Sequence, residues 1–176
     1  WGAFKPEMAG PRTPRMPWAL FTKAVDEAPT SVETITLGSL GEPLLHPRLP
    51  DMIEYIAASD RRPILYSNCT LLQGDTLKRI AATPLAVLNV SIEPNQETCK
   101  TYRGVDLNTI YRNVEAFIAA KSPKTDVKLS VVVHQGNAGH IEDLWSTWNG
   151  LIERVKLSPM VDPTFSTTRP PERCVE

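Results

Sequence analysis

The chain has 176 residues, of which 41% are hydrophobic, and its nineteen basic and twenty acidic side chains give a formal charge of −1. A charge so close to zero argues against a surface built for nucleic acid or for anionic membrane. No apolar run approaches the roughly 18 residues that a membrane-spanning helix needs. The length suits one domain, and without a secretory signal we expect it in the cytoplasm.

Both ends are interpreted as cuts through a longer protein, because the first residue is Trp1 and the last, Glu176, follows a Pro-rich stretch. We expect residues 1–15 to form an extended amino-terminal segment, 16–160 the folded domain and 161–176 a Pro-rich tail. The three cysteines lie far apart in the sequence. This spacing and the odd number argue against a disulfide framework and favour a reduced compartment.

Apolar spacing predicts helices that alternate with strands. Pro17 suits the first turn of the first helix, and Asn108 is the expected cap of the longest helix. Residues 85–92 are almost continuously apolar, which is typical of a strand buried on both faces of a parallel sheet. In chain order, the predicted elements are helix 17–28, strand 32–37, helix 49–56, strand 63–66, helix 77–81, strand 85–92, helix 110–118, strand 127–133, helix 141–148 and strand 152–157.

Five strands and five helices in alternation predict an α/β fold, with parallel strands joined by right-handed crossovers and helices on the outside. Because the first element is a helix, we expect a preceding strand and its loop to belong to the parent protein. Trp145 and Trp148 on the last helix are interpreted as core residues.

Each predicted strand runs into a polar, turn-forming cluster. The carboxyl ends of parallel strands open on one side of the sheet, where ligands bind in such folds. We therefore expect a rim of polar groups. The clusters are residues 38–43 (GSLGEP), 67–70 (SNCT), 91–95 (SIEPN), 134–137 (HQGN) and 158–160 (SPM).

In the first cluster, Gly38 and Gly41 let the backbone approach a ligand, and Glu42 beside them offers a carboxylate for an ammonium group. The alternative is a plain tight turn with a solvated glutamate. Four further rim residues suit hydrogen bonding to a small polar molecule, although each is also an ordinary turn or cap residue. They are Asn68, Ser91, Glu93 and Asn137.

Two arginines near the third cluster, Arg103 and Arg112, are candidates for pairing with a ligand carboxylate, the alternative being solvent-facing side chains. The three histidines form no ligand triplet in the sequence. His46 is interpreted as part of a turn into a helix. His134 lies at a strand end, where a structural hydrogen bond is the better interpretation. No P-loop, Ser-His-Asp order or paired zinc motif is present.

Four segments resemble, in order and spacing, the core of radical S-adenosylmethionine (radical SAM) enzymes. Residues 40–47 (LGEPLLHP) resemble their GGEP motif, and residues 66–72 (YSNCTLL) resemble their S/T-N-G-T-L-L strand end. Residues 90–93 (VSIE) are similar to V-S-I-D, and residues 101–104 (TYRG) to the Y-R-G that follows it. The resemblance covers roughly residues 16–160.

The resemblance implies a partial (β/α)6 TIM-like barrel that binds S-adenosylmethionine and a [4Fe–4S] cluster. In enzymes of this kind the cluster reductively cleaves the cofactor, with electrons from an external donor, and the 5′-deoxyadenosyl radical then abstracts a substrate hydrogen; the resemblance implies the same chemistry here. By position, the loop 38–43 would hold the methionine amino group mainly through its backbone, Ser91 and Arg112 would contact the carboxylate or ribose, and 157–160 would lie near adenine. The implied cofactor-binding residues are Gly38, Ser39, Gly41, Glu42, Pro43, Asn68, Ser91, Glu93, Arg112, Ser158 and Met160.

The chain departs from this family's pattern at three points. The cluster-binding CxxxCxxC is absent and is expected before Trp1; Leu40 replaces the first glycine of GGEP, and Cys69 stands where glycine is usual. No metal ligand is therefore expected in the core. Cys174 resembles the first cysteine of an auxiliary-cluster (SPASM or twitch) domain. By analogy, such a domain implies a peptide or protein substrate.

Two rival interpretations remain open. The first is a non-catalytic scaffold of the same fold that binds a partner. The second is an unrelated α/β barrel enzyme, which would need a rim lysine, a metal triad or a carboxylate pair. No lysine of this sequence lies at a predicted strand end.

Overall fold

The computed structural model describes residues 15–38, 41–152 and 154–159. Its centre is one five-stranded sheet in the order β1-β2-β3-β4-β5, and every neighbouring pair of strands is parallel. The sheet confirms the predicted α/β class. The strands are β1 (Thr34–Leu37), β2 (Arg62–Ser67), β3 (Val87–Ser91), β4 (Asp126–Val133) and β5 (Arg154–Pro159).

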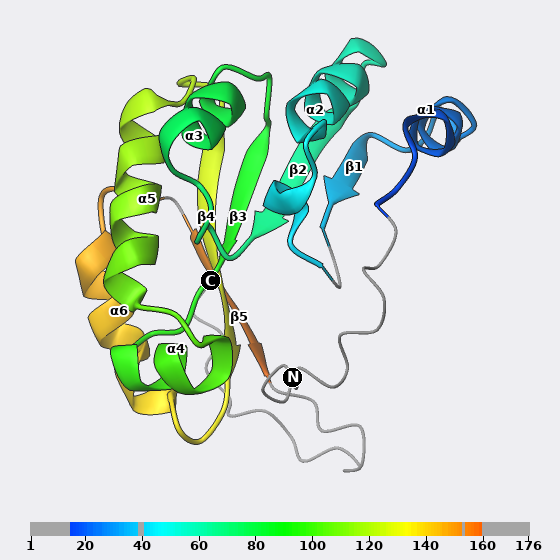
Figure 1. Cartoon of the computed structure of the whole chain (residues 1–176). Helices are drawn as coiled ribbons and strands as arrows, with labels where there is room; N and C mark the ends of the chain where they lie inside the picture. Colours follow the sequence, from blue (N-terminus) through cyan, green and yellow to red (C-terminus); the bar gives the residue numbers. More distant parts are fainter. Residues whose placement is uncertain (1–14, 39–40, 153, 160–176) are drawn as a thin grey trace, which may run out of the picture.

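Helices connect the strands and lie along the outside of the sheet (Figure 1). The first three are α1 (Trp18–Asp26), α2 (Leu49–Ala58) and α3 (Gly74–Ala81). The others are α4 (Gln96–Arg103), α5 (Leu107–Ala120) and α6 (Ile141–Trp148), with short 3-10 turns η2 (Pro43–Leu45) and η3 (Ala138–His140). No helix in the described ranges is long and apolar enough to cross a membrane.

Three details of the predicted helices were wrong. The described residues form six α-helices instead of five, because α4 has no apolar periodicity and depends on its caps, the Asn95 side chain and the left-handed Gly104. The cap of α5 is Asp106, whose carboxylate accepts the N–H of Asn108. Trp148 is buried as expected, whereas Trp145 is 42% exposed because it lies on the outer face of α6.

The main hydrophobic core lies between the sheet and helices α2 to α6, and a smaller cluster joins α1 to α2 and β1. Side chains alternate along a strand, so this core takes every second residue. The in-register core positions include Leu65 beside Leu88 and Val90 beside Leu129. The helices therefore cover one face of the sheet.

The opposite face of the sheet, here called the inner face, is largely polar. Strand pairing places Tyr66, Asn89, Lys128 and Arg154 in one row across four strands. The next row holds Ser91, Ser130 and Lys156. Interior strands of a parallel sheet are usually apolar on both faces. The polar inner face of this sheet therefore departs from the pattern usual for parallel strands.

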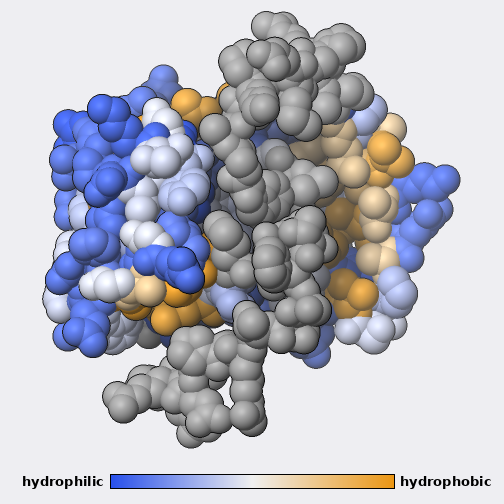
Figure 2. All heavy atoms as spheres, turned by 90° about the horizontal axis from the view of Figure 1, so that it is seen from below, coloured by the Kyte–Doolittle hydropathy of each residue, from blue (hydrophilic) through white to orange (hydrophobic). Residues whose placement is uncertain are grey.

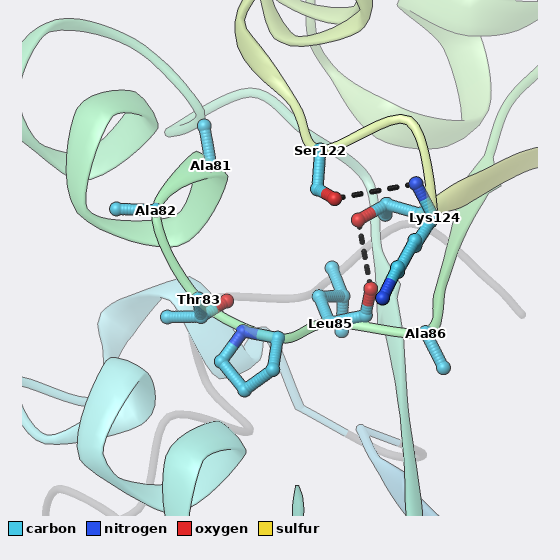
Figure 3. A pocket seen from close by; sticks show the side chains of 9 residues that line it. Ala81, Ala82, Thr83, Leu85, Ala86, Ser122 and Lys124 are labelled. Carbon is cyan, nitrogen blue, oxygen red and sulfur yellow. Dashed lines mark hydrogen bonds between the residues drawn. The ribbon is translucent and has the colours of Figure 1, made fainter.

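The two ends of the sheet differ. Figure 2 views the molecule from the carboxyl ends of the strands, where the described surface is hydrophilic on the side of α4 to α6 and more hydrophobic toward α1 and β1. At the opposite, amino end a hollow of about 410 Å³ lies between the chain segments that lead into β3 and β4 (Figure 3). Thr125 closes its wall by donating to the carbonyl of Leu85. This hollow is remote from the polar rim.

Candidate functional site

Glu42 ties the carboxyl ends of β1 and β2 together. Its Oε1 accepts the hydroxyl of Ser67 at 2.8 Å and the N–H of Leu44 at 3.0 Å. Its Oε2 accepts the N–H of Asn68 at 3.0 Å. A carboxylate has about four acceptor positions, and three of them are engaged here. Glu42 is thus mainly a positioning residue for the rim, with little capacity left for an ammonium group.

The loop after β2 is held in an unusual conformation. Cys69 has a φ of 57°, the left-handed region that glycine adopts without cost. The buried Nδ2 of Asn113, on α5, donates to the carbonyls of Cys69 at 2.8 Å and Thr70 at 3.2 Å. The N–H of Cys69 donates to the Ser67 hydroxyl. These contacts explain how this turn tolerates a side chain where glycine is usual in the resembled motif.

Gly38 is the glycine of the first loop that packing requires. Its φ is +104°, and a Cβ at this position would lie 2.5 Å from the backbone oxygen of Tyr66. Gly41, by contrast, is exposed, and a Cβ added there would meet no heavy atom within 4 Å. Close packing against Tyr66 therefore explains why residue 38 is a glycine, whereas packing imposes no such requirement at Gly41.

A second network lies where β3 and β4 end. The buried carboxylate of Glu93 accepts Arg103 Nε at 3.1 Å on Oε1, and Arg103 Nη2 lies 3.0 Å from the same oxygen. Its Oε2 accepts the Nδ2 of the fully buried Asn137 at 3.2 Å. Asn137 also donates to Val132 O and accepts the N–H of His134. A buried charge needs partners of this kind.

His134 lies against the same carboxylate. Its Nδ1 accepts the N–H of Gly136 at 3.1 Å, so the neutral ring carries its proton on Nε2. Nε2 is buried, lies 4.0 Å from Glu93 Oε2 and has no hydrogen-bond partner among the described residues. The ring of Tyr102 packs edge-on against the imidazole. The histidine has a structural environment, as predicted, with one polar atom left toward Glu93.

The two cysteines within the described ranges are poorly suited to bind iron. Cys69 and Cys99 are both buried free thiols. Burial raises the pKa of Cys99 to about 11 and raises that of Cys69 further. Metal ligation needs the thiolate. In the described parts of the chain, no group of three or more His, Cys, Asp or Glu residues is arranged to hold a metal ion.

The other predicted site residues differ in their surroundings. Ser91 and Ser158 lie on the inner face, and neither hydroxyl has a hydrogen-bond partner among the described residues. Pro43 opens η2. The exposed Arg112 donates to the carbonyl of Asn108 and to Thr109 on its own helix. Three predicted residues lie outside the described ranges: Ser39, Met160 and Cys174.

Sequence reasoning did not single out Asn113 or the side-chain role of Ser67. Asn113 was detectable, because it is a polar residue within the apolar stripe of Ile110, Val114 and Phe117 on α5. A buried polar residue in such a stripe needs a partner, although the sequence does not say which one. The Oδ1 of Asn68, a predicted site residue, accepts hydrogen bonds from the N–H and the hydroxyl of Thr70.

Together, the described residues define an open, parallel α/β half-barrel with its polar groups at the carboxyl ends of the strands. Two carboxylates organise the rim, and the inner face carries serine hydroxyls that have no partner among the described residues. This arrangement suits a polar organic ligand that needs both donors and acceptors. It is unsuited to a metal ion held by the described side chains alone.

Comparison with known proteins agrees with this class. No protein-family model matches the chain. The chain is 26% identical over 137 residues to the tungsten-containing aldehyde ferredoxin oxidoreductase cofactor-modifying protein of Pyrococcus furiosus, covering 73% of this chain and 38% of that protein. The chain thus spans well under half the length of this relative.

Solved structures share the fold at low sequence identity. A domain of pyruvate-formate lyase-activating enzyme from Bacteroides vulgatus matches with a TM-score of 0.62 at 18% identity, covering 76% of this chain and 84% of that domain. SuiB of Streptococcus suis matches with a TM-score of 0.62 at 14% identity, covering 77% of this chain and 31% of that one. SuiB structures bound to S-adenosylmethionine and to the precursor peptide SuiA match at 0.59 and 0.55. The fold expected from the radical SAM resemblance is confirmed.

Proposed function

We propose that this chain is the cofactor-binding core of a radical SAM enzyme. In this proposal the half-barrel binds S-adenosylmethionine, and a [4Fe–4S] cluster is held by a cysteine-bearing segment that precedes Trp1 in the parent protein. When both are bound, they supply a 5′-deoxyadenosyl radical for hydrogen abstraction from the substrate. The described cysteines do not fit the cluster, so its ligands must come from elsewhere.

The observation that carries the proposal is the joining of β1 and β2 through Glu42. Glu42 belongs to the segment that resembles GGEP, and Ser67 and Asn68 belong to the segment that resembles S/T-N-G-T-L-L. These segments are separated by 25 or 26 positions, yet they share one carboxylate. These contacts join two of the resembled motifs, which supports the proposal. The structural likeness to SuiB, solved with S-adenosylmethionine, supports the same ligand.

The described residue types suit this cofactor. Its amino group needs acceptors, and the Glu42 carboxylate is almost saturated, so in this proposal backbone carbonyls of the loop 38–43 would provide them. Its carboxylate and ribose need donors, and Ser91 on the inner face has a hydroxyl without a partner among the described residues. The remaining predicted contacts of the cofactor, Asn68, Ser158 and Met160, stay part of the proposal.

Between the two arginines, we favour Arg103 for the cofactor carboxylate. Arg103 is at the rim, and within the described residues its two contacts with Glu93 leave three of its five N–H donors for a second anion. Glu93 would hold the guanidinium in place. Arg112 is bound to its own helix in this structure and is the secondary candidate.

The finer parts of the proposal concern partners. An external electron donor would reduce the cluster, and the substrate would be a peptide or protein, as in the SuiB structure with its precursor peptide. Cys174 would be the first ligand of an auxiliary iron–sulfur cluster in the following domain.

The test uses the full-length parent, reconstituted anaerobically with iron and sulfide. We expect visible cluster absorption and, after reductant and S-adenosylmethionine are added, formation of 5′-deoxyadenosine. In variants with an intact cluster, Ser91→Ala and Arg103→Lys should raise the KM for S-adenosylmethionine by about tenfold, the size expected for a lost hydrogen bond to a charged group.

Arg112→Lys is the matched control and should leave that KM within about twofold. A larger effect of Arg112→Lys than of Arg103→Lys would exchange the two roles. Absence of both cluster and cleavage would overturn the radical enzyme and leave a scaffold that binds another partner.

A further inference from the structure

The inner face carries a group of cations on its last two strands. Lys128 on β4 lies in register with Arg154 on β5, and Ser130 on β4 lies in register with Lys156. Residues two apart on one strand share a face, so Lys128, Arg154 and Lys156 all point to the same side of the sheet. We call these three residues, which occupy two successive inner-face register positions across β4 and β5, the cation row.

No described carboxylate neutralises the cation row. The ion pairs formed among the described residues involve none of its three members. Asp126 is the one carboxylate that strand pairing puts on the inner face of the described strands, and it stands at the start of β4. Like charges directly opposite one another on neighbouring strands are destabilising. The row therefore has a net positive charge that calls for an anion.

Protection of an exposed sheet edge explains only part of this pattern. Lysine and arginine are common on edge strands, where they prevent unwanted pairing. This reason applies to Arg154 and Lys156, because β5 is the last strand of the described sheet. It does not apply to Lys128, which is half-buried on β4 with partner strands on both sides.

The neighbouring groups indicate an extended peptide as the occupant. Ser130 and Ser158 add hydroxyls to the inner face beside the row. Within the described residues, β5 pairs only with β4, so its other side offers backbone donors and acceptors of the kind that bind an extended chain. A peptide with acidic side chains would use both the backbone groups and the cations.

We propose that the cation row on β4 and β5 binds an acidic segment of a peptide partner on the inner face. The inference deepens the proposed function. It rests on that proposal in one respect, because it treats the bound peptide as the substrate of the enzyme. Binding through charge should weaken as salt is raised, because Arg154 and Lys156 are exposed to solvent.

The test measures fluorescence anisotropy of a labelled octapeptide of alternating alanine and glutamate with the full-length parent at low salt. The variant K128Q/R154Q/K156Q should bind it about tenfold more weakly. The control K78Q/R79Q/K100Q removes the same charge from exposed helical positions and should change binding by less than about twofold. Circular dichroism verifies that both variants fold.

Several outcomes would overturn the inference. Equal losses in both variants would mean a response to net charge alone. Equal binding of an alanine–glutamine octapeptide would show that acidity is not recognised. Citrate binding to the row as tightly as the peptide would make the occupant a small polyanion. Tenfold tighter peptide binding by D162N/E172Q/E176Q would identify the protein's own tail as the occupant.

The result can be separated from the proposed function. Peptide anisotropy needs neither cluster nor S-adenosylmethionine, whereas 5′-deoxyadenosine formation needs both. Loss of peptide recognition with normal 5′-deoxyadenosine formation would refute the cation row alone. Normal recognition without cluster or cleavage would refute the radical enzyme alone.

Discussion

The shared carboxylate of Glu42 allows a quantitative test of how the rim is held together. Replacing Glu42 with alanine removes the acceptor of two backbone N–H groups and of the Ser67 hydroxyl. A hydrogen bond to a charged group contributes about 1.5–3 kcal/mol. Because Glu42 is only half-buried, we use the lower limit for each of the three bonds and expect Glu42→Ala to reduce the free energy of unfolding by about 4–5 kcal/mol.

A double-mutant cycle with Ser67→Ala isolates one of these bonds. Ser67 donates to Glu42 at 2.8 Å and accepts the N–H of Cys69 at 2.9 Å, so the single variant also loses the second contact. The cycle cancels that second loss and should give a coupling energy of about 1–1.5 kcal/mol. The free energies are measured by urea unfolding, followed by circular dichroism.

The exposed Glu54 on α2 is the matched control, and Glu54→Ala should change stability by less than about 0.5 kcal/mol. Additive effects of Glu42→Ala and Ser67→Ala, within about 0.3 kcal/mol, would refute the reasoning. In that event the carboxylate would not connect the two strand ends in solution.

Three further predictions concern single positions. Gly38→Ala should cost at least about 2 kcal/mol of unfolding free energy, because its Cβ would meet the backbone oxygen of Tyr66, whereas Gly41→Ala should be nearly neutral; equal effects would contradict this packing. Asn113→Leu should lose about 2–3 kcal/mol and speed amide hydrogen exchange in the loop after β2, and unchanged exchange would show that Asn113 does not hold that loop. Burial raises the pKa of the Cys99 thiol from 9.0, the value of a free thiol, to about 11, so the thiol is neutral in the native state below that pH. The neutral thiol therefore stabilises the native state fully below pH 9 and less and less between pH 9 and 11. Urea unfolding should accordingly show a smaller loss of unfolding free energy over this interval in Cys99→Ala than in the wild type. The same loss in both proteins would exclude Cys99 as its cause.

Local sequence pattern was sufficient where one apolar stripe determines an element. The spacing of Phe21 and Val25 predicted α1, and both side chains are buried against α2. The same reasoning could not detect α4, in which Cys99 and Thr98 are the buried residues. That helix depends on its caps and on Gln96, which accepts the N–H of Leu107 from the following helix.

The rim shows the same division between local and long-range information. Turn-forming clusters after successive strands predicted that polar groups gather at one end of the sheet, since strand direction alone determines where the strands end. The partners of each group were not predictable, because they come from distant parts of the chain. Asn137 and Glu93 are 44 positions apart, as are Asn113 and Cys69.

The sequence by itself thus determined the α/β alternation, the parallel connections and the end of the sheet that carries polar groups. These features follow from apolar periodicity and turn chemistry, which act over a few residues. Only the tertiary structure decided that Glu42 and Glu93 are engaged by the protein, that Arg103 and not Arg112 contacts the rim, and that Lys128 lies beside Arg154. Those outcomes depend on strand register and on helix packing, and neither quantity is encoded in any short segment.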